Sequence, residues 1–341
     1  YKRQWVDGAI AGSGGTARPI IISRILGGDP MAATQLNHGR QAQELIEAGF
    51  LLDLTDVAEA GGWADIVNPS SLLDACTLDG RIYCVPINIH SAQWIWLSHA
   101  AYENAGLPVP ANWNDFVETA PALEAAGTLP LAMGQQGWQQ SIAFGAITLA
   151  VAGLDAWKEV NVNKNADVAR GPDYTAAFEA AAAARQFASA SAVQDWNLAT
   201  NMVITGTAGA QIMGDWAQGE FAVAGQVEGE DYSCLPGLGL NAVLDTGGDA
   251  FYFPVNDDPE ITAAQKELAA LLISPEVQVS FNLAKGSLPV RGDIDMSSAN
   301  GCMQKGLGIL ADGGVLPSAD ISFSADTQTQ IEDLMAQFWS S

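Results

Sequence analysis

The chain has 341 residues, of which 48% are hydrophobic and 16% charged, and its 39 acidic against 14 basic side chains give a net charge of −25. A chain of this length is too long for one ordinary hydrophobic core, so two lobes are expected. Phosphate contacts need clustered Lys and Arg, so the acidic balance argues against nucleic acid and anionic membranes as partners.

A short strand is predicted at residues 32–37, after a turn made of two glycines, an aspartate and a proline. Because side chains alternate along a strand, Gln35 and Asn37 point to one face and Leu36 to the other. A helix is predicted at residues 40–48, ending at a glycine. Two solvent-exposed amides beside the start of this helix are the alternative to a binding role.

Four cysteines are spread along the chain without a CxxC pair, and with only three histidines a zinc site is not expected. In an oxidising compartment two disulfides can form, and four cysteines allow three pairings. Cys76 and Cys84 flank the Asp-Gly turn signal at residues 79–80, so they can face each other across a hairpin. Cys234 and Cys302 would then close a longer loop. Four buried free thiols are the alternative.

Residues 93–97 are apolar and aromatic, which predicts a buried strand after the hairpin. His90 lies just before this run, at a polar interruption. A lone histidine there is either a hydrogen-bonded core residue or a site residue, and the residues alone leave both open. The composition then shifts to Gly, Pro and Asn, which predicts the first crossing between lobes near residues 98–104.

Ala- and Leu-rich segments predict helices at residues 115–126, 141–151 and 173–190. Between the first two, the sequence MGQQGWQQ predicts a turn that presents Trp138 among glutamines, which favours a binding cleft over the core. No apolar run approaches the roughly 20 residues needed to span a bilayer.

Residues 196–221 are small and apolar in the middle, and a strand at residues 210–213 meets a glycine-containing turn that carries Trp216. An aromatic side chain at such a junction usually faces a cleft. Sugar rings combine an apolar C–H face with a rim of hydroxyls, so they are bound by Trp for stacking and by Asp, Asn, Gln, Lys and His for hydrogen bonds. The chain is rich in both kinds of residue near its turns.

In the last third, the alternating residues 251–253 and the polar segment after them predict the second crossing, near residues 250–253. Helices are predicted at residues 262–273 and from Ser274 to Lys285, where the lysine complements the helix dipole whether or not it also binds a ligand. A third crossing is predicted near residues 305–312. The closing helix at 327–339 has an apolar stripe, formed by Ile331, Leu334, Met335 and Phe338. This stripe is predicted to pack in the core.

An ordered set of motifs resembles the carbohydrate-binding receptors of bacterial ABC importers, the extracellular solute-binding proteins of family 1, and most closely their glucose and monosaccharide branch. The pieces are residues 195–221, which end in GDWAQGEF, then residues 249–251, NLAKGSLPVR at 282–291 and LPSA at 316–319. The resemblance runs nearly end to end. Each piece alone is weak, but their order is specific.

The resemblance implies an α/β, two-lobed periplasmic-binding-protein-like fold of type II, with discontinuous lobes and a ligand cleft between them. The lobes would be residues 1–98 plus 253–305 and residues 104–250 plus 312–341, joined by the crossings named above. In such a receptor, closure of the hinged lobes on a ligand is the signal read by a membrane permease. We therefore expect a monomeric, exported, periplasmic receptor for a mono- or small oligosaccharide, without cofactor or metal. In this family a first strand and helix with ligand contacts precede the point where the sequence opens, and the export signal would lie there too.

Eight residues are the candidate ligand contacts: Gln35, Asn37, His90, Trp138, Trp216, Asp249, Lys285 and Asp320. Trp138 is chosen for its polar turn, and the other seven stand at positions of the family's motifs or cleft. The two tryptophans would stack on sugar rings and the others would exchange hydrogen bonds with hydroxyls. Two positions depart from the family pattern. Asn37 stands where His or Lys is common, and Asp320 stands where glucose-type receptors often carry His, which turns a potential donor into an acceptor.

Two other functions remain open at this point. A carbohydrate-active enzyme would need two carboxylates at a set separation, and Asp215, Glu220, Asp249 and Asp320 offer candidates. No nucleophile elbow, metal triad or phosphate loop accompanies them, so we expect no catalytic residues. An adhesion or scaffold module would bind no small ligand at all.

Overall fold

A computed structural model describes residues 8, 10 and 14–341 of the chain. The chain divides into two compact units, each built from discontinuous segments: unit 1 is Tyr1–Ile87, Asp249–Gln278 and Val290–Asp293, and unit 2 is Asn88–Gly248, Val279–Pro289 and Ile294–Ser341. The predicted lobe boundaries and hinge crossings remain predictions.

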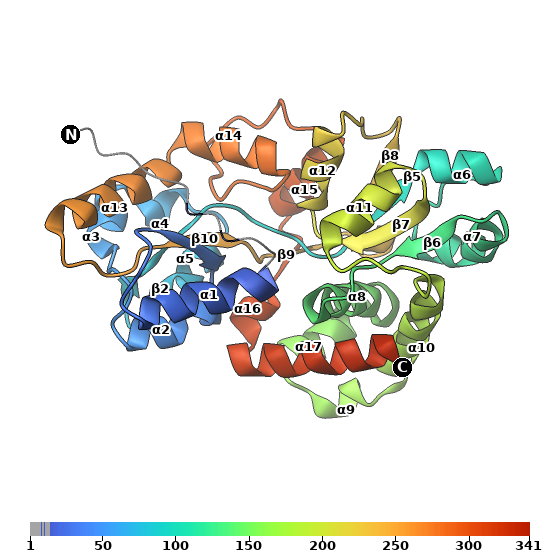
Figure 1. The fold of residues 1–341 in the computed structure, drawn as a ribbon, viewed down its shortest axis with the longest axis horizontal. Helices are drawn as coiled ribbons and strands as arrows, with labels where there is room; N and C mark the ends of the chain where they lie inside the picture. Colours follow the sequence, from blue (N-terminus) through green and yellow to red (C-terminus); the bar gives the residue numbers. More distant parts are fainter. Residues whose placement is uncertain (1–7, 9, 11–13) are drawn as a thin grey trace. The chain divides into compact units, whose positions relative to one another are not determined.

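Unit 1 is a small antiparallel sheet with helices around it (Figure 1). Its helices are α1 (Gly14–Leu26), η1 (Arg40–Ala42), α2 (Gln43–Glu47), α3 (Thr55–Ala60), α4 (Trp63–Ile66), α5 (Ser71–Ala75) and α13 (Pro259–Leu272), and its strands are β1 (Thr34–Asn37), β2 (Thr77–Leu78), β3 (Arg81–Ile82), β4 (Cys84–Pro86) and β10 (Asp249–Tyr252). Helix α14 (Pro275–Lys285) begins in unit 1 and ends in unit 2.

The sheet of unit 1 has the order β1-β10-β4, with both pairs antiparallel. Leu36 lies opposite Ala250, and both are buried in a core that also contains Tyr252. Because neighbours along a strand alternate between faces, Asn37 and its partner Asp249 lie on the other face of the sheet. The predicted strand at 32–37 is thus confirmed, although it begins at Thr34.

Both predicted disulfides are present. Cys76 and Cys84 are joined across the β2–β3 hairpin with their Cα atoms 5.1 Å apart, and Cys234 is joined to Cys302 with a Cα–Cα distance of 6.0 Å. The alternative of four free thiols is therefore wrong, since no cysteine is left over.

The two disulfides are expected to contribute unequally to stability. The loop-entropy relation predicts a loss of about 4 kcal/mol when the Cys234–Cys302 bond, with a separation of 68 residues, is removed by a double Cys→Ala substitution, against about 2.5 kcal/mol for the Cys76–Cys84 bond, with a separation of 8. Urea unfolding of the two double variants in parallel measures the difference. A larger loss from the shorter loop would show that strain or local packing outweighs chain entropy.

Unit 2 is a four-stranded sheet between helices (Figure 1). Its helices are α6 (His99–Ala105), α7 (Trp113–Ala125), α8 (Gly137–Asn161), α9 (Ala166–Ala169), α10 (Pro172–Phe187), α11 (Trp196–Ile204), α12 (Ala217–Val223), η2 (Gly237–Gly239), α15 (Gly301–Ala311), α16 (Ala319–Ser322) and α17 (Ala325–Ser340), and its strands are β5 (Trp94–Ser98), β6 (Leu129–Ala132), β7 (Ala208–Met213), β8 (Tyr232–Pro236), β9 (Leu244–Asp245) and β11 (Val315–Leu316). The short strands β9 and β11 pair in parallel.

The alternation of β5 explains how helices cover both faces of this sheet. Ile95 and Leu97 are buried in the core that contains residues of α8, α10 and α17. Trp96 points to the opposite face, where its ring stacks on Phe221 of α12 at 5.4 Å and its Nε1 donates to the Met213 carbonyl at 2.9 Å. Helix α12 is therefore fixed against the end of β7 by a buried aromatic stack.

Helix α8 is the longest helix that the structure describes, with 25 residues, and by length and composition alone it is apolar enough to cross a membrane. This corrects the expectation that no apolar segment approaches the length needed to span a bilayer. The segment was missed in the sequence because Gly and Ala residues separate its larger apolar side chains. Forty-four per cent of its apolar window is buried within unit 2, where it packs against α10 and α17. We interpret α8 as a core helix. Its helical geometry is interrupted at Gly153, whose φ is 85°.

The predicted core stripe of the closing helix is partly wrong. Met335 is buried and Ile331 and Phe338 pack against the same core, but Leu334 is 58% exposed. By helical periodicity, Leu334 lies at the edge of the apolar stripe, which is why it was included in the prediction. The packed face, however, follows the i, i+4, i+7 positions of the other three residues.

Candidate functional site

The strand directions of unit 2 bring four loop segments to one edge of its sheet. Strand β5 is antiparallel to β7 and β8, and β6 is parallel to β7, so the residues after β6, β7 and β8 meet the residues before β5. Two backbone hydrogen bonds show this: the Asp215 N–H donates to the Ser91 carbonyl at 3.0 Å, and the Gly237 N–H donates to the Gln93 carbonyl at 2.7 Å. Residues at this edge are the candidates for a site.

Trp216 stands at the turn between β7 and α12, as the sequence predicted. It is the N-cap residue of α12 and is partly exposed. The turn requires Gly214, because a Cβ there would lie 2.1 Å from the Trp216 ring. The indole therefore lies directly over the backbone of this turn.

Lys285 is in the last turn of α14. Two glycines allow it to lie close to the turn that holds Trp216. A Cβ on Gly219 would lie 3.1 Å from the Lys285 carbonyl oxygen, and Gly286 has a φ of 82°, which favours glycine. The Lys285 ammonium also acts electrostatically on Asp215. The structure thus brings Lys285 to the Trp216 turn.

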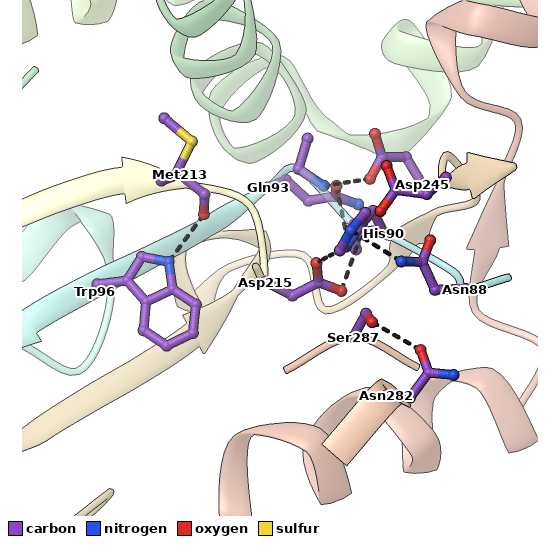
Figure 2. Close-up of polar contacts among 12 residues, drawn as sticks. Asn88, His90, Gln93, Trp96, Met213, Asp215, Asp245, Asn282 and Ser287 are labelled. Atoms are coloured by element: carbon purple, nitrogen blue, oxygen red, sulfur yellow. Dashed lines mark hydrogen bonds and ion pairs between the residues drawn. The ribbon is translucent and has the colours of Figure 1, made fainter. Parts of the chain in front are cut away.

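Beside the turn, His90 and Asp215 form a buried pair (Figure 2). The His90 Nδ1 lies 2.7 Å from Asp215 Oδ1, and the Asn88 amide nitrogen lies 3.2 Å from His90 Nε2. The second carboxylate oxygen of Asp215 accepts the Ser91 N–H at 3.1 Å. Since an amide nitrogen is only a donor, Nε2 must accept and Nδ1 must carry the proton in the neutral ring.

Two carboxyl groups at this edge have raised pKa values. Burial raises the pKa of Asp215, while the neighbouring His90 and the charge of Lys285 act in the opposite direction. Burial also raises the pKa of Asp245 to about 7, opposed by the Ala92 N–H, which it accepts at 2.6 Å, and assisted by the charge of Asp215. Asp245 therefore holds its proton about half of the time near neutral pH.

The rings of His90, Trp216 and Trp138 lie together at this edge of the sheet, and we call them the aromatic corner. The Trp216 ring meets the His90 imidazole edge to face, with centroids 5.0 Å apart and planes at 77°, and it lies 6.4 Å from the Trp138 ring at 43°. Trp138 is partly exposed, and its Nε1 donates to Gln136 Oε1 at 2.6 Å. The sequence predicted a turn over residues 133–140, but helix α8 begins at Gly137, so Trp138 sits in its first turn.

A separate polar group lies on the sheet of unit 1. The Gln35 amide donates to Asp249 Oδ1 at 2.7 Å, and Asn37 is the cross-strand partner of Asp249. The Tyr252 hydroxyl donates to the Asn37 carbonyl at 3.2 Å, which fixes the strand end. Gln35, Asn37 and Asp249 thus form one cluster on the face away from the core.

The structure gathers seven of the eight predicted residues into two groups. Unit 2 brings together His90, Trp138, Trp216 and Lys285, and unit 1 brings together Gln35, Asn37 and Asp249. Asp320 lies in the short helix α16 of unit 2 and is partly exposed. Sequence reasoning missed Asn88 and Asp245 and gave Asp215 no binding role. Only the GDW run pointed to Asp215; nothing local pointed to the other two.

Comparison with known proteins identifies the family. Residues 8–279 match the family described as bacterial extracellular solute-binding protein. Over 306 residues the chain is 34% identical to a probable sugar-binding periplasmic protein of Brucella melitensis, covering 89% of this chain and 72% of that protein. A protein of the same name from Rhizobium meliloti is 33% identical over 311 residues, covering 90% and 74%. The chain belongs to the bacterial extracellular solute-binding proteins.

The fold of this solute-binding protein agrees with that of solved structures. A chitin oligosaccharide binding protein superposes with a TM-score of 0.76 over 94% of this chain and 81% of that one, at 20% identity. The predicted α/β, two-lobed periplasmic-binding-protein-like fold class is thereby confirmed. Members of the family are receptors and not enzymes, which confirms that part of the prediction and gives the carboxylate-pair alternative no support.

Proposed function

We propose that this protein is the extracytoplasmic receptor of a sugar ABC importer, which binds a mono- or small oligosaccharide and delivers it to a membrane permease. The observation that carries the proposal is the aromatic corner of unit 2, where two partly exposed indoles lie 6.4 Å apart beside a buried polar pair. Pyranose rings offer C–H faces to such indoles. Relatives named as sugar-binding periplasmic proteins support the ligand class.

The polar contacts follow from the chemistry of each side chain. Lys285 supplies donors, and Asp249 and Asp320 supply acceptors for sugar hydroxyls. The amides of Gln35 and Asn37 supply both. One cation among several acids favours a neutral sugar over an acidic one, and a neutral aldose of the glucose type is the first candidate. The same proposal includes a periplasmic location and a monomeric receptor.

A thermal-shift screen of neutral, amino and acidic sugars on the full mature chain tests the proposal. A sugar at one hundred times its Kd should stabilise the protein by about 2.7 kcal/mol. Calorimetry then gives the affinity, and chromatography of the recovered sugar shows whether it is unchanged. Turnover of the sugar would indicate an enzyme, and the absence of any shift across the panel would favour a module without a small ligand.

Asp249→Ala is expected to weaken sugar binding about tenfold or more with little loss of stability. The reason is that a buried hydroxyl left without its acceptor costs about 1 to 3 kcal/mol, and 1.4 kcal/mol is tenfold in affinity. Calorimetry measures the affinity, and Asp257→Ala, which removes an exposed acid from the same unit, is the control. A variant that fails to fold would mark the bond between Gln35 and Asp249 as structural instead.

A further inference from the structure

We propose that Asp215 is a positioning residue of the sugar site, which acts through His90 and Asn88 to hold Trp216 in its binding orientation. This inference rests on the proposed function, because it assigns a role within the same site. It also assigns His90 a different role from the predicted one: the imidazole supports the indole and does not bind sugar hydroxyls through its nitrogens.

Asp215 joins two segments of unit 2 through three hydrogen bonds. One carboxylate oxygen accepts from His90 Nδ1 at 2.7 Å and the other accepts from the Ser91 N–H at 3.1 Å, while its backbone N–H donates to the Ser91 carbonyl at 3.0 Å. The residue is only 5% exposed. A carboxylate so placed ties the segment before β5 to the turn after β7, and Trp216 is the next residue of that turn.

The hydrogen bonds from Asn88 to His90 and from His90 to Asp215 donate in the same direction, and we call this series the relay. Asn88, which is fully buried, donates its amide N–H to His90 Nε2, and the proton on Nδ1 is donated to Asp215. Both nitrogens of His90 are thereby engaged, and the residue is 8% exposed. What the imidazole offers to the site is its contact with the Trp216 ring, at 5.0 Å and 77°.

This relay predicts a specific defect in Asp215→Asn. An amide of the same shape has one acceptor and one donor, so it cannot accept from both Ser91 and His90. Either its NH2 group faces the Ser91 N–H, or it faces Nδ1 and forces the imidazole proton to Nε2, where the Asn88 amide already donates. The first arrangement buries two opposed donors beside Trp216. The second does so too unless the Asn88 amide also turns over, which gives up the contacts that its oxygen and nitrogen make now.

The relay also predicts a rescue. In the double variant Asn88→Asp, Asp215→Asn the direction is reversed: Asp at 88 accepts from Nε2–H, Nδ1 accepts from the new amide at 215, and the amide oxygen still accepts the Ser91 N–H. Every group is satisfied again and the network keeps its single negative charge. Asn88→Asp alone places a carboxylate at each ring nitrogen, which favours a doubly protonated imidazole that donates to both. Asp215→Asn should therefore bind sugar more weakly than the double variant does, and nitrogen NMR of Asn88→Asp should show a doubly protonated ring.

The experiment has two independent readouts. The first is the tautomer of His90 by nitrogen NMR, which needs no sugar and is tractable because the chain has three histidines. We expect an Nδ1–H ring in the wild type and an Nε2–H ring in the double variant. The second is calorimetry with D-glucose, or with the neutral sugar that gives the largest thermal shift. We expect a loss of about tenfold or more in Asp215→Asn and recovery to within a few-fold in the double variant.

Asp312→Asn, a substitution of an exposed acid in unit 2, is the control, and near-UV circular dichroism verifies that each variant folds. A neutral wild-type ring protonated on Nε2, or wild-type affinity in Asp215→Asn, overturns the inference even if sugar binds. Failure of every sugar to bind, with the Nδ1–H tautomer observed, would count against the proposed function and leave the relay standing. If Asp215→Asn does not fold, the wild-type tautomer and the doubly protonated ring expected in Asn88→Asp still decide the question.

Discussion

Replacing Trp216 by alanine is expected to abolish sugar binding and to leave the fold intact. The indole is partly exposed and belongs to neither of the two core clusters described for residues 14–341, so its loss removes little core packing. It is, however, the residue that joins His90 and Trp138 into one aromatic corner. Loss of a large aromatic contact of about 3 kcal/mol corresponds to more than a hundredfold in affinity.

Calorimetry with the sugar chosen by the thermal-shift screen measures this loss. Trp157→Ala is a matched control, since Trp157 is a partly exposed tryptophan on α8 of the same unit. Trp216→Phe should fall between the wild type and the alanine variant, because it keeps an apolar ring of smaller area. Wild-type affinity in Trp216→Ala would remove this residue from the site, and equal losses in Trp216→Ala and Trp157→Ala would point to a general effect on the fold.

Trp216 was predictable because its signal is local. A run of small apolar residues predicts a buried strand, a glycine ends it, and an aromatic follows. The structure supplies the reason for the glycine, since any Cβ at position 214 would collide with the indole. The disulfide across the β2–β3 hairpin was predictable for the same reason, because a turn signal lies between two cysteines that are only 8 residues apart.

The partners of Asp215 were not predictable, because they depend on strand pairing over long separations. His90 and Asp215 are 125 residues apart, and Ala92 and Asp245 are 153 apart. Periodicity shows that β5 and β7 are strands but not that they are neighbours. Only their antiparallel register places the residues before β5 beside those after β7.

The start of α8 was missed for a local reason. Its N-cap is Gln136, which makes no side-chain capping bond, and glycines at positions 134 and 137 favour a turn over a helix. The Gln136 side chain instead accepts from Trp138 and donates to Asp195 at 2.6 Å. A glutamine that orients an indole in this way resembles an ordinary polar loop residue in the sequence.

Asp245→Asn is expected to stabilise the protein above about pH 7 and to have a progressively smaller effect as the pH falls toward 4. Burial raises the pKa of this carboxyl from its ordinary value near 3.8 to about 7. Between these values the folded protein holds a proton that the unfolded chain has released, so the free energy of unfolding falls as the pH rises. Above pH 7 the folded state carries the full cost of a buried charge, which the neutral amide removes.

The upper bound of the effect is about 4 kcal/mol, because three pKa units correspond to about 1.4 kcal/mol each, and partial exposure of Asp245 lowers it. The amide oxygen can still accept the Ala92 N–H, which Asp245 now accepts at 2.6 Å, so the change acts mainly through charge. The repulsion between Asp245 and Asp215 is one of the causes of this pKa shift, so its removal is already included in the upper bound. Urea unfolding at pH 5 and pH 8 measures the difference, with Asp312→Asn as the exposed control. An equal change in stability at both pH values would show that Asp245 is ionised throughout and that its burial is compensated in the folded protein.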